Sequence, residues 1–167
     1  LRNTKPLINK ALAVQMVGII GWSAAIFVNL WLGSYFVEQI IFAFAALALT
    51  AQLWFVKLFP RNALPAHLSN YWSITVGAFF IAISFAPDAL FTALEVTPAG
   101  YTILTNGPLS GLYALFVVAY ILGAIVTLYY KRKKLKQPLE RLQATYLLAG
   151  FILFFAVNLL TNSILPV

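Results

Sequence analysis

The sequence predicts an all-α integral membrane protein, a five-transmembrane-helix bundle with its N-terminus in the cytoplasm and its C-terminus outside. Three observations lead to this fold class. Hydrophobic residues make up 62% of the 167 residues and charged residues only 9%, whereas a soluble domain has about 25% charged residues. Five apolar segments are each long enough to cross ~30 Å of hydrocarbon as a helix. In the resulting topology, all 11 Lys and Arg residues fall on one side.

The five segments are predicted as helices because a chain in lipid must satisfy its own backbone hydrogen bonds. They cover residues 11–32, 36–59, 65–86, 109–130 and 138–166. Pro65 and Pro138 stand where a first helical turn tolerates proline, and Pro87 follows the third segment. Together the segments form one transmembrane domain over residues 1–167. Because the chain begins at Leu1 without a methionine, we expect it to be part of a longer protein.

The basic residues predict the orientation. If the N-terminus is cytoplasmic, the inner segments contain every Lys and Arg, while the outer side carries Glu38, Asp88 and Glu95. Since Lys and Arg are enriched in cytoplasmic loops, this split predicts a multi-pass protein of the cell inner (cytoplasmic) membrane. The fourth and fifth helices are joined by a basic loop whose expected partners are anionic lipids. The predicted lipid-headgroup residues are Lys131, Arg132, Lys133, Lys134, Lys136 and Arg141.

One loop, residues 87–108, is long and lies outside. Its part "DALFTALE", residues 88–95, starts with an Asp cap and has helical apolar spacing, which predicts a helix on the membrane surface. Its part "EVTPAGYTILTNG", residues 95–107, has β-branched residues around Pro-Ala-Gly, which predicts a β-hairpin. Surface helix, hairpin and plain connector are left open. An ordered loop would cover a pocket that opens outward.

Polar residues inside the apolar segments predict a binding site, because burying them in lipid is costly and they usually face a partner or cavity. We expect a polar pocket in the outer half of the bundle, beneath the 87–108 loop. The candidate ligand-binding residues are Trp22, Asn29, Glu38, Asn158 and Asn162. The alternative is that these side chains join helices through hydrogen bonds worth about 0.6 kcal/mol each.

The sequence lacks the motifs of catalysis. It has no Gly-rich phosphate loop, no H-E-x-x-H motif and no clustered carboxylates, no cysteine and a single histidine, His67. His67 and Asp88 stand at opposite ends of the third segment, ~30 Å apart by helical rise. We therefore expect no catalytic residue, metal site or cofactor, and no enzyme activity. The basic run lacks the surrounding folded domain that nucleic-acid binding needs, so no nucleic-acid partner is expected.

The second half of the chain carries a series of short motifs. A Gly-Pro-led helix with Leu-Tyr near its start is followed by a basic loop, an Arg-x-Gln helix entry, "YLLAG", and an Asn before a final Leu-Pro. The positions are Gly107, Pro108, Leu112, Tyr113, Arg141, Gln143, Tyr146, Gly150, Asn158 and Pro166. With "NLW" at 29–31 and "LWFVKLFPR" at 53–61, the chain resembles the N-terminal seven-transmembrane sensor region of bacterial histidine kinases.

The resemblance implies that the five helices are the middle five of seven, with one helix before Leu1 and one after Val167. No phosphoacceptor-histidine or ATP-binding segment is present, so a kinase output would lie elsewhere in the protein. The implied function is signal transduction in a two-component system, by a module that binds an extracellular or membrane-borne signal. Two other functions are left open, a non-catalytic structural or accessory subunit of a membrane complex and a small transporter. The expected protein partners are a second copy or other membrane subunits.

Overall fold

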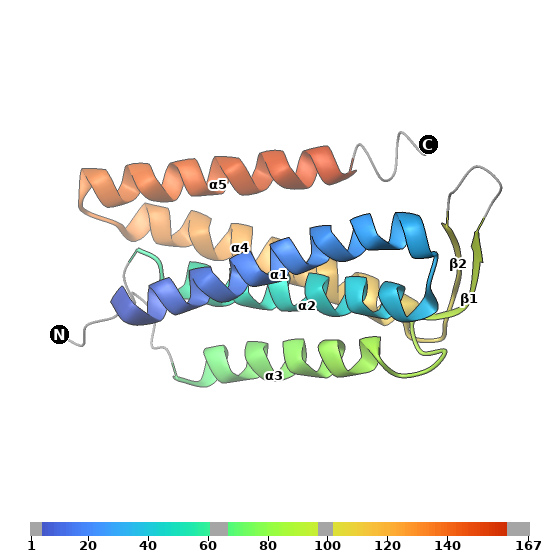
Figure 1. The fold of residues 1–167 in the computed structure, drawn as a ribbon. Helices are drawn as coiled ribbons and strands as arrows, with labels where there is room; N and C mark the ends of the chain where they lie inside the picture. Colours follow the sequence, from blue (N-terminus) through green and yellow to red (C-terminus); the bar gives the residue numbers. More distant parts are fainter. Residues whose placement is uncertain (1–4, 61–66, 97–101, 160–167) are drawn as a thin grey trace.

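The computed structural model describes residues 5–60, 67–96 and 102–159, which form five helices and one β-hairpin (Figure 1). The elements in chain order are α1 (Lys5–Leu32), α2 (Tyr35–Leu58), α3 (His67–Ser84), β1 (Phe91–Val96), β2 (Thr102–Asn106), α4 (Ser110–Lys134) and α5 (Pro138–Leu159). The prediction of five helices is confirmed. Four of them, α1, α2, α4 and α5, are long and apolar enough to cross a membrane, as expected of a multi-pass membrane protein. The apolar stretch described in α3 is shorter, Tyr71–Ser84, so a fifth span remains a prediction.

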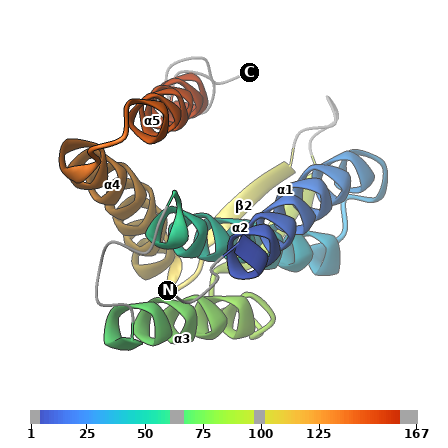
Figure 2. The same ribbon diagram turned by 90° about the vertical axis from the view of Figure 1, so that its left-hand side faces the viewer.

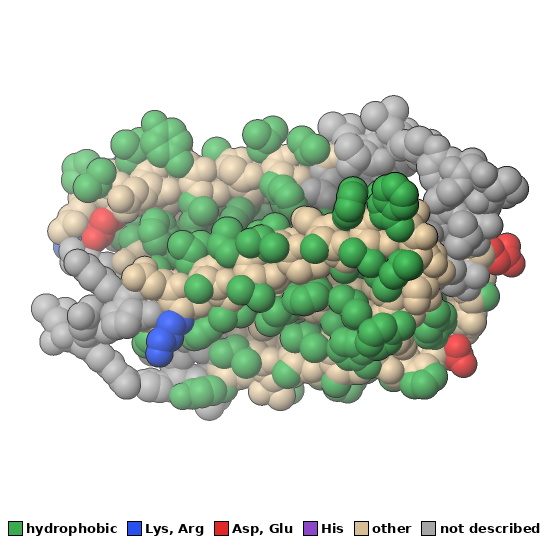
Figure 3. Space-filling view, in the orientation of Figure 1, with side chains coloured by type: hydrophobic (Ala, Val, Ile, Leu, Met, Phe, Trp, Pro, Cys, Tyr) green, Lys and Arg blue, Asp and Glu red, His purple; other side chains and the backbone are tan. Residues whose placement is uncertain are grey.

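Successive helices run in opposite directions between two ends of the bundle (Figure 1). We call one the basic end, since the ends of α2 and α4 and the start of α5 place Lys57 and residues 131–141 there. The other is the hairpin end, which carries Glu38, Asp88 and Glu95. Hydrophobic side chains are spread over the face between the two ends that Figure 3 shows. The described Lys and Arg residues therefore lie at one end, which also carries Glu140 of α5; which end faces the cytoplasm remains a prediction.

Helix α2 is the centre of the bundle, because α1, α3 and α4 all pack against it, whereas α5 packs against α4 (Figure 2). Small residues permit the close approach. A Cβ on Gly18 of α1 would lie 2.8 Å from the Cα of Ala48, and a Cβ on Gly77 of α3 would collide with the Thr50 hydroxyl. Both contacts bring a neighbouring backbone directly onto α2.

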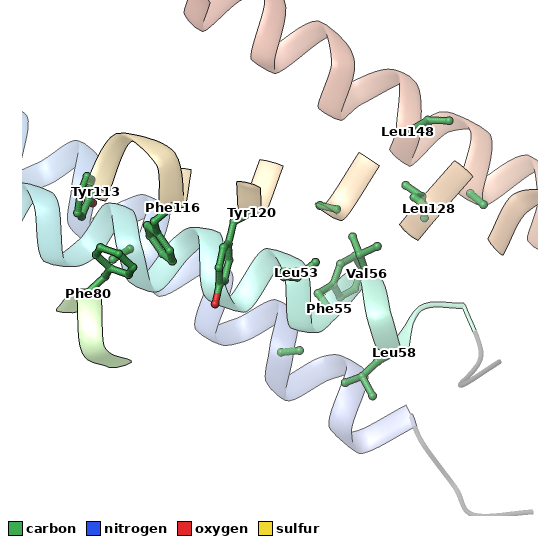
Figure 4. Close-up of a cluster of buried hydrophobic side chains, with 14 of the residues drawn as sticks. Leu53, Phe55, Val56, Leu58, Phe80, Tyr113, Phe116, Tyr120, Leu128 and Leu148 are labelled. Carbon is green, nitrogen blue, oxygen red and sulfur yellow. The ribbon is translucent and has the colours of Figure 1, made fainter. Parts of the chain in front are cut away.

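An aromatic cluster fills the core between α2, α3 and α4 toward the hairpin end (Figure 4). The rings of Phe80 and Phe116 stack with centroids 4.2 Å apart, and Phe116 and Tyr120 follow at 4.3 Å. The Tyr113 hydroxyl donates to the Phe42 carbonyl of α2 at 2.7 Å. Aromatic packing of this kind adds attraction beyond area burial, which matters in lipid, where apolar contact alone gives helices little reason to associate.

The loop over residues 87–108 forms a β-hairpin, which was predicted for 95–107 and begins earlier, at Phe91; the surface helix predicted over 88–95 is wrong. Phe91–Val96 pairs antiparallel with Thr102–Asn106, with an irregularity between Phe91 and Ala93. An isolated helix of eight residues is marginal, whereas a strand over the same residues gains ladder hydrogen bonds from its partner. The predicted Pro-Ala-Gly turn lies outside the described residues.

Two helix boundaries differ from the predicted ones by four residues or more. Helix α1 begins at Lys5 instead of residue 11, with Pro6 in its first turn, where proline is tolerated. Helix α4 continues through Lys134 instead of ending at 130, because Lys and Arg are good helix formers and their charge suits a helix C-terminus. The basic run is thus mostly helical, not a loop. Helix α5 is described to Leu159, and the predicted continuation to 166 lies outside the described residues.

The close approach of α1 to α2 predicts that Gly18→Ala destabilises the protein. The added Cβ would force the α1 and α2 backbones apart, at a cost of about 1–3 kcal/mol, measured by thermal or denaturant unfolding in nanodiscs. Gly150→Ala on α5 is the matched control, since a Cβ there meets nothing within 4 Å and alanine favours the helix. Equal stability of the two variants would show that the α1–α2 contact is not tight.

Candidate functional site

The corner between α1 and α2 is built around Asn29 and Glu38. The Gly33 amide donates to the Asn29 carbonyl at 2.9 Å, and Gly33 takes a left-handed φ of 51°, which ends α1 and turns the chain. The Asn29 side-chain oxygen accepts the Ser34 amide at 3.2 Å, and its Nδ2 donates to Glu38 Oε1 at 2.6 Å. Asn29 and Glu38 are each only 7% exposed. Two of the predicted site residues therefore meet.

Asn29 and Glu38 differ in how much of their side-chain hydrogen-bonding capacity remains unused. Asn29 uses its amide nitrogen and its amide oxygen within the corner. Glu38 has one side-chain hydrogen bond within the described part of the chain, while a carboxylate accepts up to about four. Glu38 therefore has hydrogen-bond acceptor capacity beyond its bond to Asn29.

Tyr35, at the start of α2, attaches the hairpin to the bundle. Its hydroxyl accepts the Asp88 amide at 3.0 Å and donates to the Phe91 carbonyl at 2.9 Å, and its ring lies 4.5 Å from the Phe91 ring. Asp88 has a positive φ of 55°, so the chain turns sharply before β1. At the other strand, the Gly107 amide donates to the Leu90 carbonyl at 2.8 Å. The hairpin is therefore bonded both to α2 and across its own base.

The other predicted ligand-binding residues are not brought to this corner. Trp22 lies about two turns before Asn29 on α1, roughly 10 Å by helical rise, and is half-buried. Asn158 lies near the end of α5, which packs against α4 (Figure 2). Asn162 lies outside the described residues. Of the five predicted residues, Asn29 and Glu38 are therefore brought into contact in the described part of the chain.

Lys131, predicted among the lipid-headgroup residues, is placed inside the bundle instead. It is 3% exposed, and its ammonium donates to the carbonyls of Val56 at 2.9 Å, Lys57 at 2.5 Å and Phe59 at 2.9 Å. These are carbonyls at the C-terminal end of α2, which a helix cannot satisfy by itself. A cation at this end also complements the helix dipole.

Sequence reasoning missed Lys131 because it weighed charge and not helical position. The buried face of α4 consists of residues at helical spacing that end on the lysine. These residues are Tyr113, Phe116, Tyr120, Ala124, Leu128 and Lys131. The same 3–4 periodicity could have identified the lysine as an inward-facing residue.

The remaining basic residues lie at or near the surface of the basic end, and their contact with anionic lipids stays a prediction. Lys133 places its ammonium 4.5 Å from the centroid of the Tyr129 ring. Arg132 has a buried Nε that finds no hydrogen-bond partner in the part of the chain that is described. An unsatisfied guanidinium donor favours an anion such as a lipid phosphate.

Comparison with protein-family models, with curated proteins and with solved structures gives no match for this chain. Among the side chains of residues 5–60, 67–96 and 102–159 that are described, no three His, Asp or Glu groups gather where they could hold a metal ion. The descriptions of the corner at Asn29 and Glu38 and of the buried Lys131 therefore rest on geometry alone.

The Tyr35 anchor predicts that Tyr35→Phe loosens the hairpin while leaving the helices intact. The ring contact with Phe91 remains, but the hydroxyl bonds to Asp88 and Phe91 are lost, at about 1–2 kcal/mol. Amide hydrogen exchange in β1 and β2 should accelerate by roughly 10-fold. Tyr146→Phe, on an exposed residue of α5, is the control. Unchanged exchange in Tyr35→Phe would contradict the anchoring role.

The buried lysine predicts that Lys131→Met destabilises the protein by about 2 kcal/mol, because three carbonyls at the end of α2 lose a charged donor. Denaturant unfolding in micelles measures the loss. Lys133→Met, which removes the same charge from an exposed position of the same helical turn, should lose much less. Similar losses in the two variants would mean that net charge, and not the contact with α2, sets the stability.

Proposed function

We propose that the chain is a membrane-embedded sensory module of a histidine-kinase-type receptor, with the hairpin end outside and the basic end in the cytoplasm. The observation that carries the proposal is the buried Asn29–Glu38 pair beneath the anchored hairpin. An ionisable residue within a spanning segment is rare, and its usual reason is function. In the proposed orientation this carboxyl lies at the outer end, where an extracellular or membrane-borne signal arrives.

The chemistry of Glu38 defines the class of signal. A carboxyl group with acceptor capacity to spare, whose existing donor is a neutral amide, suits a ligand that carries an amine, an amide or another hydrogen-bond donor. Such a ligand would compete with Asn29 Nδ2 for Glu38. The contact between α1 and α2 at the hairpin end would then change, and a ligand that prefers the opened corner shifts the bundle toward it.

A second function, a non-catalytic accessory subunit of a larger membrane complex, is favoured by α5. This helix packs against α4 and leaves large apolar and aromatic side chains uncovered, including Tyr146 at 70% and Leu153 at 66% exposure. Lipid covers such a face in a sensory module, whereas a partner protein covers it in an accessory subunit. Co-purification of a stoichiometric membrane protein in mild detergent would favour this second function.

The sensory proposal predicts a ligand response that depends on Glu38. The chain in nanodiscs is titrated with a panel of small amines and amides beside their hydrocarbon analogues, and binding is followed as a rise in Tm. We expect Glu38→Gln to lower the affinity for a ligand that gives a response by about 10-fold or more, because one charged hydrogen bond is worth about 1.4 kcal/mol or more.

Gln15→Leu is the matched control, since Gln15 is a buried polar residue of α1 far from the corner and its loss should leave the response unchanged. A response that survives in both Glu38→Gln and Asn29→Ala would assign these residues to helix packing alone. The reading frame that encodes the chain is a further check. A frame without a cytoplasmic signalling domain would contradict the receptor proposal.

A further inference from the structure

Helix α2 is bonded at both ends by side chains of other elements. At the hairpin end, Glu38 accepts from Asn29 of α1 and Tyr35 holds the hairpin. At the basic end, its terminal carbonyls accept from Lys131 of α4. Figure 1 shows α2 running the length of the bundle between these two places. The two ends of α2 are therefore bonded to different helices, α1 at one end and α4 at the other.

The basic end of α2 is bonded to two helices at once. The Lys57 carbonyl accepts a hydrogen bond from Lys131 of α4, and the Lys57 ammonium donates to the Ser73 hydroxyl of α3 at 3.0 Å. The Ser73 carbonyl in turn accepts from the Tyr120 hydroxyl of α4. These bonds form a polar network inside an apolar bundle, in which the position of Lys57 sets contacts to both α3 and α4.

The place of Lys131 on α4 determines which groups its ammonium can reach. The lysine belongs to the last turn of α4, which ends at Lys134, and a lysine near a helix end can extend its ammonium to the headgroup layer. The two positions exclude each other, since one ammonium cannot serve the α2 carbonyls and a lipid phosphate together. A lysine that changes between these two positions provides the two discrete states that a coupling element requires.

We infer that Lys131 is a releasable clasp through which a displacement of α2 reaches α4. With the clasp closed, the last turn of α4 is held on α2. When α2 shifts, its carbonyls leave the ammonium, which extends to anionic headgroups and frees the turn between α4 and α5. The direction of the signal rests on the proposed function. Lys131 is the residue that passes this signal to the basic end.

The test uses the whole chain in liposomes of phosphatidylcholine with phosphatidylglycerol. The sequence contains no cysteine, so spin labels attach only at introduced ones. One labelled pair, at the exposed positions Phe36 and Thr105, reports the hairpin end; a second, at the exposed positions Asn9 and Lys134, reports the basic end. Each pair is measured by pulsed dipolar spectroscopy, with and without Asn29→Ala to disturb the outer corner.

We expect Asn29→Ala to shift the distance distributions of both pairs. Adding Lys131→Met should leave the shift at the hairpin end and reduce the shift at the basic end to less than a third. Lys133→Met, the control for charge, should preserve both shifts. If Lys131→Met loses helical content by circular dichroism, Lys131→Gln, which keeps a donor without the charge, replaces it.

Two results would overturn the clasp while leaving the sensory proposal intact. One is a hairpin-end shift with no basic-end shift in the chain that retains Lys131. The other is a basic-end shift of equal size with and without Lys131. If Asn29→Ala moves neither pair, the coupling through α2 is refuted, and the corner also loses its role as the receiving site.

Discussion

The burial of α2 against three other helices is the constraint on which the rest of the bundle depends. In lipid there is no water to satisfy a polar group, so each one has to be satisfied by protein. The buried positions of α2 include several alanines, among them Ala43, Ala46 and Ala51, and glycines of α1 and α3 lie directly on this helix. Such close approach leaves little room for solvent even inside the bundle. Wherever α2 carries a polar group, a specific partner must therefore be provided.

The partners come from other helices because a helix cannot satisfy its own ends. Lys131 supplies the donor for the last carbonyls of α2, and Asn29 supplies both an acceptor for the Ser34 amide and a donor for Glu38. Each bond contributes modestly in a membrane, yet losing one partner leaves the other buried and unsatisfied. Interhelical polar bonds therefore fix which helices are neighbours and at what height, while apolar contacts fill the space between them.

The sequence predicted much of the fold because hydropathy and charge report directly on the membrane. It did not predict Lys131, since a lysine after an apolar run resembles a surface residue, and the burial of its ammonium depends on α2 ending beside it. The sequence predicted a surface helix over 88–95 and a hairpin only over 95–107. The pairing of Phe91–Val96 with Thr102–Asn106 extends the hairpin into the segment expected to be helical. Asn158 was predicted to lie near Asn29 because both were expected at the same level along the bundle axis. That level does not reveal that α5 packs on α4.

The two interpretations of the polar corner, helix packing and ligand binding, need not exclude each other. Asn29 uses both the nitrogen and the oxygen of its side-chain amide in hydrogen bonds within the corner, as expected of a residue that holds helices together. Glu38 has a single side-chain bond among the described residues and is buried at the same depth, so part of its acceptor capacity is left over. A ligand that competes for this bond acts on the interaction that holds α1 to the start of α2. A receptor needs this overlap, because a ligand changes a conformation only through a bond that differs between the two states.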